Sequence, residues 1–414
     1  MKSIVRAAFV ACLMVTAAGT LAPSPVWAED KLSAKVGKPL NDAIKSAQAN
    51  DFPGALAHVK EAQAVDGRTP FEDYKINTIL AYISIQMKDY ATATTATEAA
   101  ADSPAMPDAD KKEMLHNALL LATQANQYQK AITYGTQLAA VNGMDATTEA
   151  MLARAYYESK DFPNAQKYAQ MSIDASKAAN QPPSEVALDI VMSSQAKQND
   201  QAGAQQTLEN LALNYNRASD WSQLIDVALG GKNVKDADAL YLLRLKYMIP
   251  DAMRDFDYTS LASVADQQSY ATEAYSVLQK GISSGKITQA KAGATYAHAK
   301  AGAAIDQKGL GEIAASAEKA KTGQQDIKYA EDLWGYGRYA DAEAAARRAI
   351  SKGGLKDPSE GPMLLGMLLV AQGKYDDAIA TLGQVTGTHA NTAHLWSVYA
   401  QAQKKSPSST AAQH

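Results

Sequence analysis

Cysteine is nearly absent from this sequence. The only one among 414 residues is Cys12, close to the N-terminus, so the rest of the chain cannot form disulfides and must be stabilised by packing. Phenylalanine is also scarce, with five copies against twenty tyrosines, whereas alanine is abundant. This composition suits tightly packed helix pairs and suits a β-sandwich poorly, because a sandwich needs alternating β-branched residues. It therefore favours an all-α fold.

Long runs of one charge are missing as well. Charged residues make up 20% of the chain, both signs are mixed along it, and the formal net charge is −4. Proteins contact phosphate groups through clustered lysine and arginine, and no basic patch is apparent in the sequence. We therefore expect no nucleic-acid partner.

Motifs of familiar enzymes such as HExxH and GxxxxGK[ST] are also lacking. His389 and His394 are five residues apart, a poor spacing for two metal ligands on one helical face, so we expect both to be solvated near a helix start. The acid pair Glu72-Asp73 falls near a first helical turn, where carboxylates interact favourably with the helix dipole. We therefore predict no enzymatic activity, no metal and no cofactor.

The N-terminus has the pattern of a secretory signal peptide. Lys2 and Arg6 precede an apolar run at 7–18, and Val26-Trp27-Ala28 offers the small residues that a signal peptidase recognises. A membrane anchor is the alternative, but the run is short for a hydrocarbon core of about 30 Å, and prolines follow it. Lipid attachment at Cys12 is disfavoured because little apolar sequence precedes it. Cleavage after residue 28 would give a bacterial periplasmic or secreted protein with a net charge near −6 and no membrane span.

A small polar turn, an aromatic residue and, three positions later, an alanine recur six times along the chain. Consecutive alanines lie 38, 38 and 34 residues apart in the first block and 36 apart in the last pair. The aromatic-x-x-alanine pattern alone would arise about five times by chance. The regular spacing of the copies, and not the pattern itself, therefore predicts stacked helical hairpins. We expect these anchors to lie in the core. The pairs are Phe52 with Ala55, Tyr90 with Ala93, Tyr128 with Ala131, Phe162 with Ala165, Tyr339 with Ala342, and Tyr375 with Ala378.

The clearest unit lies near the C-terminus. Leu365 and Gly366 fall on one face of a first helix, Gly373 breaks that helix, and Tyr375 and Ala378 begin a second one. Glycine and alanine are small where two helix backbones must approach closely, and the tyrosine fills the gap between neighbouring hairpins.

This unit resembles the tetratricopeptide repeat family. The family signature has a Leu-Gly pair in the first helix, then a turn, an aromatic residue and an alanine three residues on. Its early tryptophan and its terminal proline are absent here. The resemblance covers about residues 70–210 and 323–390. It implies a right-handed superhelical α-solenoid of about nine to ten helical hairpins with degenerate middle repeats, of a bacterial exported type.

The middle of the chain keeps the period without the signature. Ala204 and Ala274 lie 70 residues apart, and the next anchor alanine follows 68 residues later, which is two repeats in each case. We expect degenerate hairpins near 221–248 and 288–320. The alternative is an inserted helical domain.

The predicted organisation follows from these spacings. A last helix near 392–404 would cap the open end of the stack, as solenoids require, or would begin a further repeat. The predicted segments are a signal peptide at 1–28, an N-terminal repeat array at 29–217, divergent repeat-like hairpins at 218–322, C-terminal repeats with the capping helix at 323–405, and a disordered tail at 406–414.

In this family the first helices line the concave face, so the resemblance places candidate partner-binding residues there. Tyrosine and arginine are enriched at binding hot spots, although a solvated helix face is the alternative. A clamp for peptide C-terminal carboxylates is not supported, because the basic residues lie two repeats apart. The candidate partner-binding residues are Lys75, Tyr82, His116, Arg154, Tyr157 and Glu158, together with Thr78, Gln86, Thr123, Asp189 and Lys197.

The predicted function is a non-enzymatic interaction scaffold of the bacterial cell envelope that binds a protein or peptide on this face. The alternative is binding of a small ligand, such as a cell-wall fragment or polysaccharide, whose sugar rings would stack on tyrosines. An enzyme of unrecognised type would require acidic and histidine side chains that converge in one deep pocket.

Overall fold

The computed structural model describes residues 31–231 and 234–405, and every regular element within these ranges is a helix. The predicted signal peptide at 1–28 and the predicted tail at 406–414 lie outside the described residues. Contacts between Cα atoms divide the chain into two compact units, one up to Asp200 and one from Gln201. The prediction of an all-α fold is confirmed.

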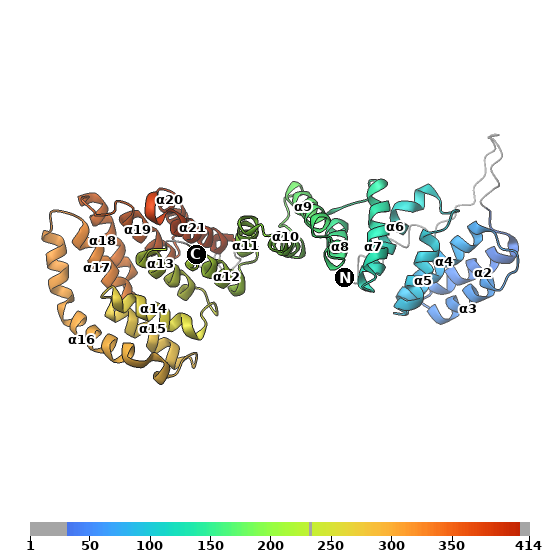
Figure 1. Cartoon of the computed structure of the whole chain (residues 1–414). Helices are drawn as coiled ribbons and strands as arrows, with labels where there is room; N and C mark the ends of the chain where they lie inside the picture. The colour runs from blue at the N-terminus through green and yellow to red at the C-terminus, as the bar shows by residue number, and fades with distance from the viewer. Residues whose placement is uncertain (1–30, 232–233, 406–414) are drawn as a thin grey trace. The chain divides into compact units, whose positions relative to one another are not determined.

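Unit 1 is a series of helical hairpins (Figure 1). Its helices are α2 (Ala34–Gln48), α3 (Phe52–Gln63), α4 (Pro70–Gln86), α5 (Tyr90–Ala101), α6 (Asp108–Gln124), α7 (Tyr128–Ala140), α8 (Ala146–Glu158), α9 (Phe162–Ala178) and α10 (Glu185–Lys197). Extensive packing joins α2 to α3, α4 to α5, α6 to α7 and α8 to α9, and α9 packs against α10 as extensively as α6 does against α7. First helices of neighbouring hairpins also touch, as α2 touches α4 and α6 touches α8.

Backbone geometry explains the recurring polar turn. In all six copies, the residue two positions before the aromatic one has a positive φ, between 56° and 73°, which ends the first helix. The next residue is the N-cap of the second helix, and Asp51, Asp89 and Asp161 each accept a backbone N–H bond there. Glycine adopts the left-handed conformation most readily, followed by asparagine. The positive-φ residues are Asn50, Lys88, Asn126, Lys160, Gly337 and Gly373.

The anchor alanines lie in the buried core. In the hairpin of α19 and α20 the two helices also approach closely at a glycine, because a Cβ atom at Gly366 would overlap the side chain of Leu382. Close approach of the two helix backbones therefore determines the core of each hairpin, and the alanines offer no surface to a partner. All six are 0% exposed: Ala55, Ala93, Ala131, Ala165, Ala342 and Ala378.

The aromatic anchors lie nearer the surface than expected. Each is the first residue of its second helix, so it lies at the turn, one helical turn before the buried alanine. Tyr90 is 55% exposed. The other five are only half-buried: Phe52, Tyr128, Phe162, Tyr339 and Tyr375.

Unit 2 contains the remaining helices. They are α11 (Gln201–Tyr215), α12 (Ala218–Leu229), α13 (Asp236–Met248), α14 (Asp255–Gln267), α15 (Ala271–Ser283), α16 (Gln289–Lys319), α17 (Gln324–Gly335), α18 (Tyr339–Lys352), α19 (Glu360–Ala371), α20 (Tyr375–Leu382), the short 3-10 helix η1 (Gly387–His389) and α21 (Ala390–Lys405). The helices α12 and α13 lie where a hairpin was expected near 221–248.

The hairpin predicted near 288–320 is wrong. This segment forms α16, which is 31 residues long and is interrupted by a kink at Gly293, after which helix continues to Lys319. Its non-helical residue is Gly293, near its start, with φ 56° and ψ −142°. The sequence after this glycine is rich in alanine and has no proline, so nothing ends the helix where a hairpin turn would need to be.

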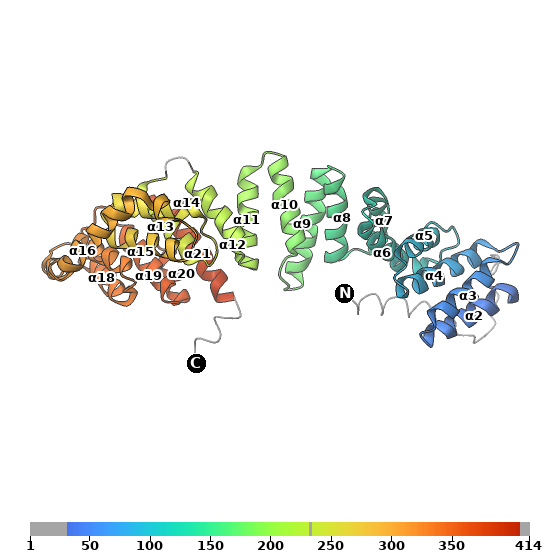
Figure 2. The same cartoon turned by 90° about the horizontal axis from the view of Figure 1, so that it is seen from below.

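Helix α21 brings the two ends of unit 2 together. It packs against α19 and α20, as a capping helix would, and also against α11 and α13 (Figure 1, Figure 2). The indole N–H of Trp396 donates to the carbonyl of Tyr241 at 3.1 Å, and the rings of Trp221 and Tyr399 meet edge to face, 5.3 Å apart. Both tryptophans are fully buried. Unit 2 is therefore closed by its last helix.

A buried arginine joins three helices of unit 2. Arg244 of α13 is 1% exposed, and its guanidinium donates to Glu273 of α15 at 2.6 and 2.8 Å and also to Glu331 of α17. The ring of Trp334 lies 5.0 Å from the guanidinium carbon. Burial raises the pKa of Glu331, because desolvation outweighs the attraction of Arg244. One buried cation thus links two carboxylates that would otherwise be costly to bury.

The turn geometry gives a test of stability. Lys160 holds a left-handed conformation that costs a residue with a Cβ atom about 1 kcal/mol. We expect Lys160→Gly to raise the free energy of unfolding of unit 1 by roughly 0.5 kcal/mol, after the entropic cost of glycine. The reverse change, Gly373→Lys, should lower the free energy of unfolding of unit 2 by about 1 kcal/mol. Urea unfolding followed by circular dichroism measures both, and a stabilising Gly373→Lys would contradict this account of the turn.

Candidate peptide-binding groove

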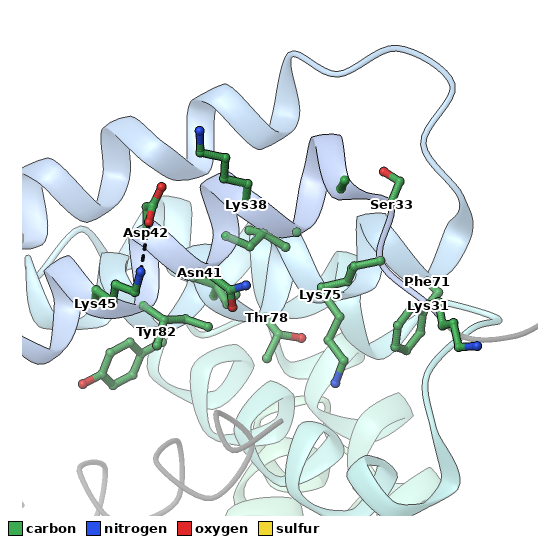
Figure 3. A pocket seen from close by; sticks show the side chains of 16 residues that line it. Lys31, Ser33, Lys38, Asn41, Asp42, Lys45, Phe71, Lys75, Thr78 and Tyr82 are labelled. Atoms are coloured by element: carbon green, nitrogen blue, oxygen red, sulfur yellow. Dashed lines mark hydrogen bonds and ion pairs between the residues drawn. The ribbon is translucent and has the colours of Figure 1, made fainter. Parts of the chain in front are cut away.

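A groove of about 760 Å³ lies between the first helices of the first two hairpins, α2 and α4 (Figure 3). Leu40 and Ile44 from α2 and Ile79 from α4 supply apolar lining. The aromatic side chains of Phe71 and Tyr82 lie toward opposite ends of the groove. The site is therefore an elongated apolar surface between two helices.

A buried carboxylate fixes the start of α2 against the start of α4. Glu72, which is 3% exposed, accepts the backbone N–H of Ser33 at 2.8 Å and that of Thr69 at 2.8 Å. The Thr69 hydroxyl accepts the Glu72 N–H in return, which completes a capping box. Hydrogen bonds from Ser33 and Thr69 lower the pKa of Glu72, so this link stays ionised at neutral pH. The acid pair noted in the sequence thus has a structural role.

The spacing of the lining residues explains the length of the groove. On α2 they recur at 34, 37, 41 and 44, and on α4 at 71, 75, 78 and 82, which places each set on one helical face. Eleven residues of helix advance by about 17 Å. A groove of this length matches about five residues of extended chain or three turns of helix.

Four lysines surround the apolar lining: Lys31, Lys38, Lys45 and Lys75. Lys75 forms an ion pair with Asp110 of α6 at 3.3 Å, and Lys45 forms one with Asp42 at 3.4 Å. Within the described residues, Lys38 forms no ion pair. The fold thus gathers at one groove four lysines that are spread over 45 positions of sequence, two of them paired with carboxylates.

The structure brings together only part of the predicted partner-binding set. Lys75, Thr78 and Tyr82 line the groove. His116 on α6 and Arg154, Tyr157 and Glu158 on α8 are half-buried or exposed, but they do not line it.

The contribution of α2 was missed, although the repeat period points to it. Shifting by the 38 residues between Ala55 and Ala93 places Gly37, Leu40 and Ile44 at the positions of Lys75, Thr78 and Tyr82. All three line the groove. Applying the register to the hairpin that precedes the clearest signatures would therefore have identified this side of the site.

Unit 2 has an acidic cluster, but it does not form a catalytic pocket. Glu273, Asp306, Glu331 and Asp332 line a cavity of only about 10 Å³, which holds at most one water molecule. Burial raises the pKa of Asp332 to about 7. Across the described residues, no three or more His, Cys, Asp and Glu side chains are arranged to hold a metal ion.

One enzyme-like pattern in the sequence was overlooked. Residues 281–285 read Gly-Ile-Ser-Ser-Gly, the spacing of a hydrolase nucleophile elbow. That motif needs a strand before the serine and a helix after it, whereas this segment is the C-terminal end of α15. The hydroxyls of Ser283 and Ser284 donate to backbone carbonyls of the same turn. The pattern therefore has a local structural role.

The two candidate metal histidines have different environments. His394 is exposed to solvent, and its Nε2 lies 2.9 Å from a carboxylate oxygen of Glu209. His389 is 3% exposed, so the expectation that it is solvated is wrong. Its Nδ1 lies 2.9 Å from the carboxylate of Asp238 on α13, which also accepts the Thr392 hydroxyl at 2.7 Å. His389 thus helps to hold the start of α21 against α13.

Residues 333–402, from the end of α17 to α21, match the family model described as tetratricopeptide repeat. This part of the chain is similar to tetratricopeptide repeats. The resemblance drawn from the Leu-Gly pair and the aromatic and alanine anchors is therefore confirmed. Proteins built from tetratricopeptide repeats are generally scaffolds without catalytic activity.

Three solved structures that resemble this chain are distant in sequence. The apo form of RapI is 9% identical, with a TM-score of 0.34, and the match covers 66% of this chain and 99% of that chain. A tetratricopeptide repeat protein from Parabacteroides merdae is 11% identical, with a TM-score of 0.29 and coverage of 89% and 99%. The yeast Sti1 TPR2AB domain, solved in complex with pHSP90, is 13% identical, with a TM-score of 0.18 and coverage of 89% and 98%.

Two further comparisons are negative. No curated protein sequence matches this chain. Among the residues that the structure describes, no helix combines the length and the apolar character needed to cross a membrane.

The closure of unit 2 should depend on pH. Burial disfavours the charged form of His389, but Asp238, Asp357 and Glu360 together raise its pKa above the ordinary value. Its protonation therefore stabilises the folded state below about pH 6.5, and this contribution is lost as the pH rises through the raised pKa. We expect the free energy of unfolding of unit 2 to fall as the pH rises above about 6.5, and His389→Gln to make that fall smaller; the raised pKa of Asp332 adds a fall of the same sign at lower pH in both proteins.

Urea unfolding at a series of pH values measures this effect. His394→Gln is the matched control, because that histidine is exposed, and it should leave the profile of the unchanged protein intact. Parallel profiles for the unchanged protein and His389→Gln would contradict a role for His389 in closure.

Proposed function

We propose that this protein is a non-enzymatic scaffold that binds a protein or peptide partner in the groove between α2 and α4. The observation that supports this most is the groove itself, on the face where the repeat register places Lys75, Thr78 and Tyr82. Repeat solenoids commonly use such faces for binding. An apolar lining with a polar rim is also the usual anatomy of a protein interface.

The shape of the groove favours a segment of polypeptide. Its lining follows two helices for about 17 Å, so an extended strand or a short helix can lie along it. Apolar side chains of the partner would bury against Leu40, Ile44 and Ile79. Tyr82 can contribute both apolar area and a hydroxyl, as tyrosines at interfaces do.

A small ligand is the second candidate, and the volume of the groove supports it. Sites for small molecules typically measure about 300–1,000 Å³, and this groove of about 760 Å³ falls in that range. Phe71 and Tyr82 could stack on sugar rings of a cell-wall fragment or polysaccharide.

Site-specific photocrosslinking tests the groove as a partner site. We expect benzoylphenylalanine at Asn41, an exposed residue that lines the groove, to capture one reproducible protein in cells, identified by mass spectrometry. The same probe at Lys35, exposed on α2 but outside the groove, is the matched control. Tyr82→Ala should weaken binding of the purified partner about tenfold, which corresponds to about 1.4 kcal/mol.

Equal capture from both positions would contradict binding in the groove. The small-ligand alternative is tested by thermal shift against glycans and muropeptides. A shift that Tyr82→Ala abolishes, together with no capture from Asn41, would replace the protein-partner proposal with the ligand one.

We further propose that the protein works in the bacterial cell envelope, in the periplasm or after secretion. The support is the signal pattern at 1–28 and the lack of cysteine after it, which suits an oxidising compartment. N-terminal sequencing of the protein from fractionated cells should find Glu29 as the first residue in the periplasm or medium. An intact Met1 in the cytoplasmic fraction would refute this location.

A further inference from the structure

A second cavity lies in unit 2, where the last helix closes it. It measures about 380 Å³, and its walls come from α11, α12, α13 and α21, which lie next to one another in Figure 1. Val227, Leu242 and Leu395 supply apolar lining. Sites for small molecules typically measure about 300–1,000 Å³. This cavity therefore has the size of a site for a small molecule, and it is separate from the groove between α2 and α4.

A buried carboxylate at this cavity has one oxygen without a partner. Asp238 lines the cavity and is 7% exposed, and its Oδ1 lies 2.9 Å from Nδ1 of His389 and accepts the Thr392 hydroxyl at 2.7 Å. Among the described residues, none donates a hydrogen bond to its Oδ2, and this oxygen is not enclosed by protein atoms. Carboxylates need hydrogen-bond donors when they are buried. We therefore expect Oδ2 to receive its donor from the occupant of the cavity.

The cavity also contains a second carboxylate. Glu209 lines it from α11, and its Oε1 lies 2.9 Å from Nε2 of His394. The side-chain amides of Gln205 and Asn391 belong to the lining as well, and each can accept or donate hydrogen bonds. Among the described lining residues there is no lysine or arginine. The lining therefore offers acceptors to a ligand that carries donors.

Cationic side chains around the cavity offset the charge of its carboxylates only in part. The exposed Lys235 donates to the hydroxyl of Thr388, a lining residue, at 3.3 Å. His389 and His394 add a positive charge only when they are protonated. At a pH where both histidines are neutral, two carboxylates face one lysine. The cavity then attracts a cation and repels an anion.

We propose that this cavity binds a small organic cation, namely a primary amine with a short apolar chain. Its ammonium would donate to Oδ2 of Asp238, and its chain would lie against Val227, Leu242 and Leu395. An ammonium group has three donors and no acceptor, which suits a lining of carboxylate and amide oxygens. A second ammonium on the same chain would find Glu209 in the same cavity.

Binding of the amine would also stabilise the closure of unit 2. The ligand would touch α11 and α13 from the start of this unit and α21 from its end. A ligand that binds only the folded state stabilises it by mass action. This site is distinct from the groove of the proposed function, so each can fail without the other.

Thermal unfolding of the purified protein with a defined amine tests the site. The probe is cadaverine, a five-carbon diamine, at about 10 mM and about pH 8, and the five-carbon diol is the matched neutral compound at equal ionic strength. We expect cadaverine to bind with a Kd of about 1 mM or tighter and to raise the Tm of unit 2 by about 3 °C. The diol should leave the Tm unchanged. Isothermal titration calorimetry should show a single site for cadaverine.

Substitutions locate the amine in the cavity. Asp238→Asn should weaken cadaverine binding about tenfold or more, and Glu209→Gln about threefold or more. Asp236→Asn is the matched control and should cost less than about twofold, because Asp236 is exposed on the same helix and does not line the cavity. Circular dichroism checks that the variants are folded. Because Asp238 also holds His389, Glu209→Gln decides the result if Asp238→Asn does not fold.

Other results would contradict this site. If the diol raises the Tm as much as cadaverine does, the cavity does not select a cation. If Asp236→Asn weakens binding as much as Glu209→Gln does, the amine is held by general attraction and not by the cavity. If cadaverine does not bind at all, the cavity is not a site for such an amine. None of these results affects capture from Asn41, which tests the groove separately.

Discussion

The structure depends on close approach of paired helices at residues without bulky side chains. The anchor alanines are completely buried, and Gly366 faces Leu382 so closely that even one added carbon would overlap it. The second helix of each hairpin packs through its small residues on the first helix. The opposite face of the first helix takes no part in this packing. In unit 1 that free face, on α2 and α4, becomes the groove. Packing and the candidate site therefore follow from one register.

Local features were predictable because they repeat at short range. The polar turn and the buried alanine, such as those at Ala131, Ala165 and Ala342, depend on residues a few positions apart, and the structure has both at every copy. The same repeat register predicted the α4 side of the groove, where Lys75 and Tyr82 lie.

Other features depend on longer-range packing or on local residue preference. The gathering of lysines at the groove was not predictable, because Lys31 and Lys75 come to line the same groove only when α2 and α4 pack together. The prediction of a hairpin at 288–320 was wrong. The repeat period indicates where a turn could occur, but no turn forms where the residues themselves favour helix.

The two units are stabilised in different ways. In unit 1 the buried polar links are short connections between adjacent hairpins, such as Glu72 to Ser33. In unit 2 the charged side chain of Arg244 is buried among aromatic rings and bridges three helices. Buried ion pairs add little net stability over apolar residues, yet removing one partner is costly, so they favour one arrangement over others. No sequence period could have revealed this network, since Arg244 and Glu331 lie 87 positions apart.

The closure of unit 2 by α21 has a consequence for the order in which the chain can fold. Hydrogen bonds of unit 1 such as those from Ser33, Tyr74 and Ser172 join residues 39, 36 and 26 positions apart. The contacts that close unit 2 join residues 151 to 187 positions apart. Hairpins of unit 1 can therefore assemble one after another while the ribosome is still adding residues. Unit 2 must wait for its final helix, so the surfaces of α11 and α13 that α21 covers stay exposed to water until Ala390–Lys405 has been synthesised.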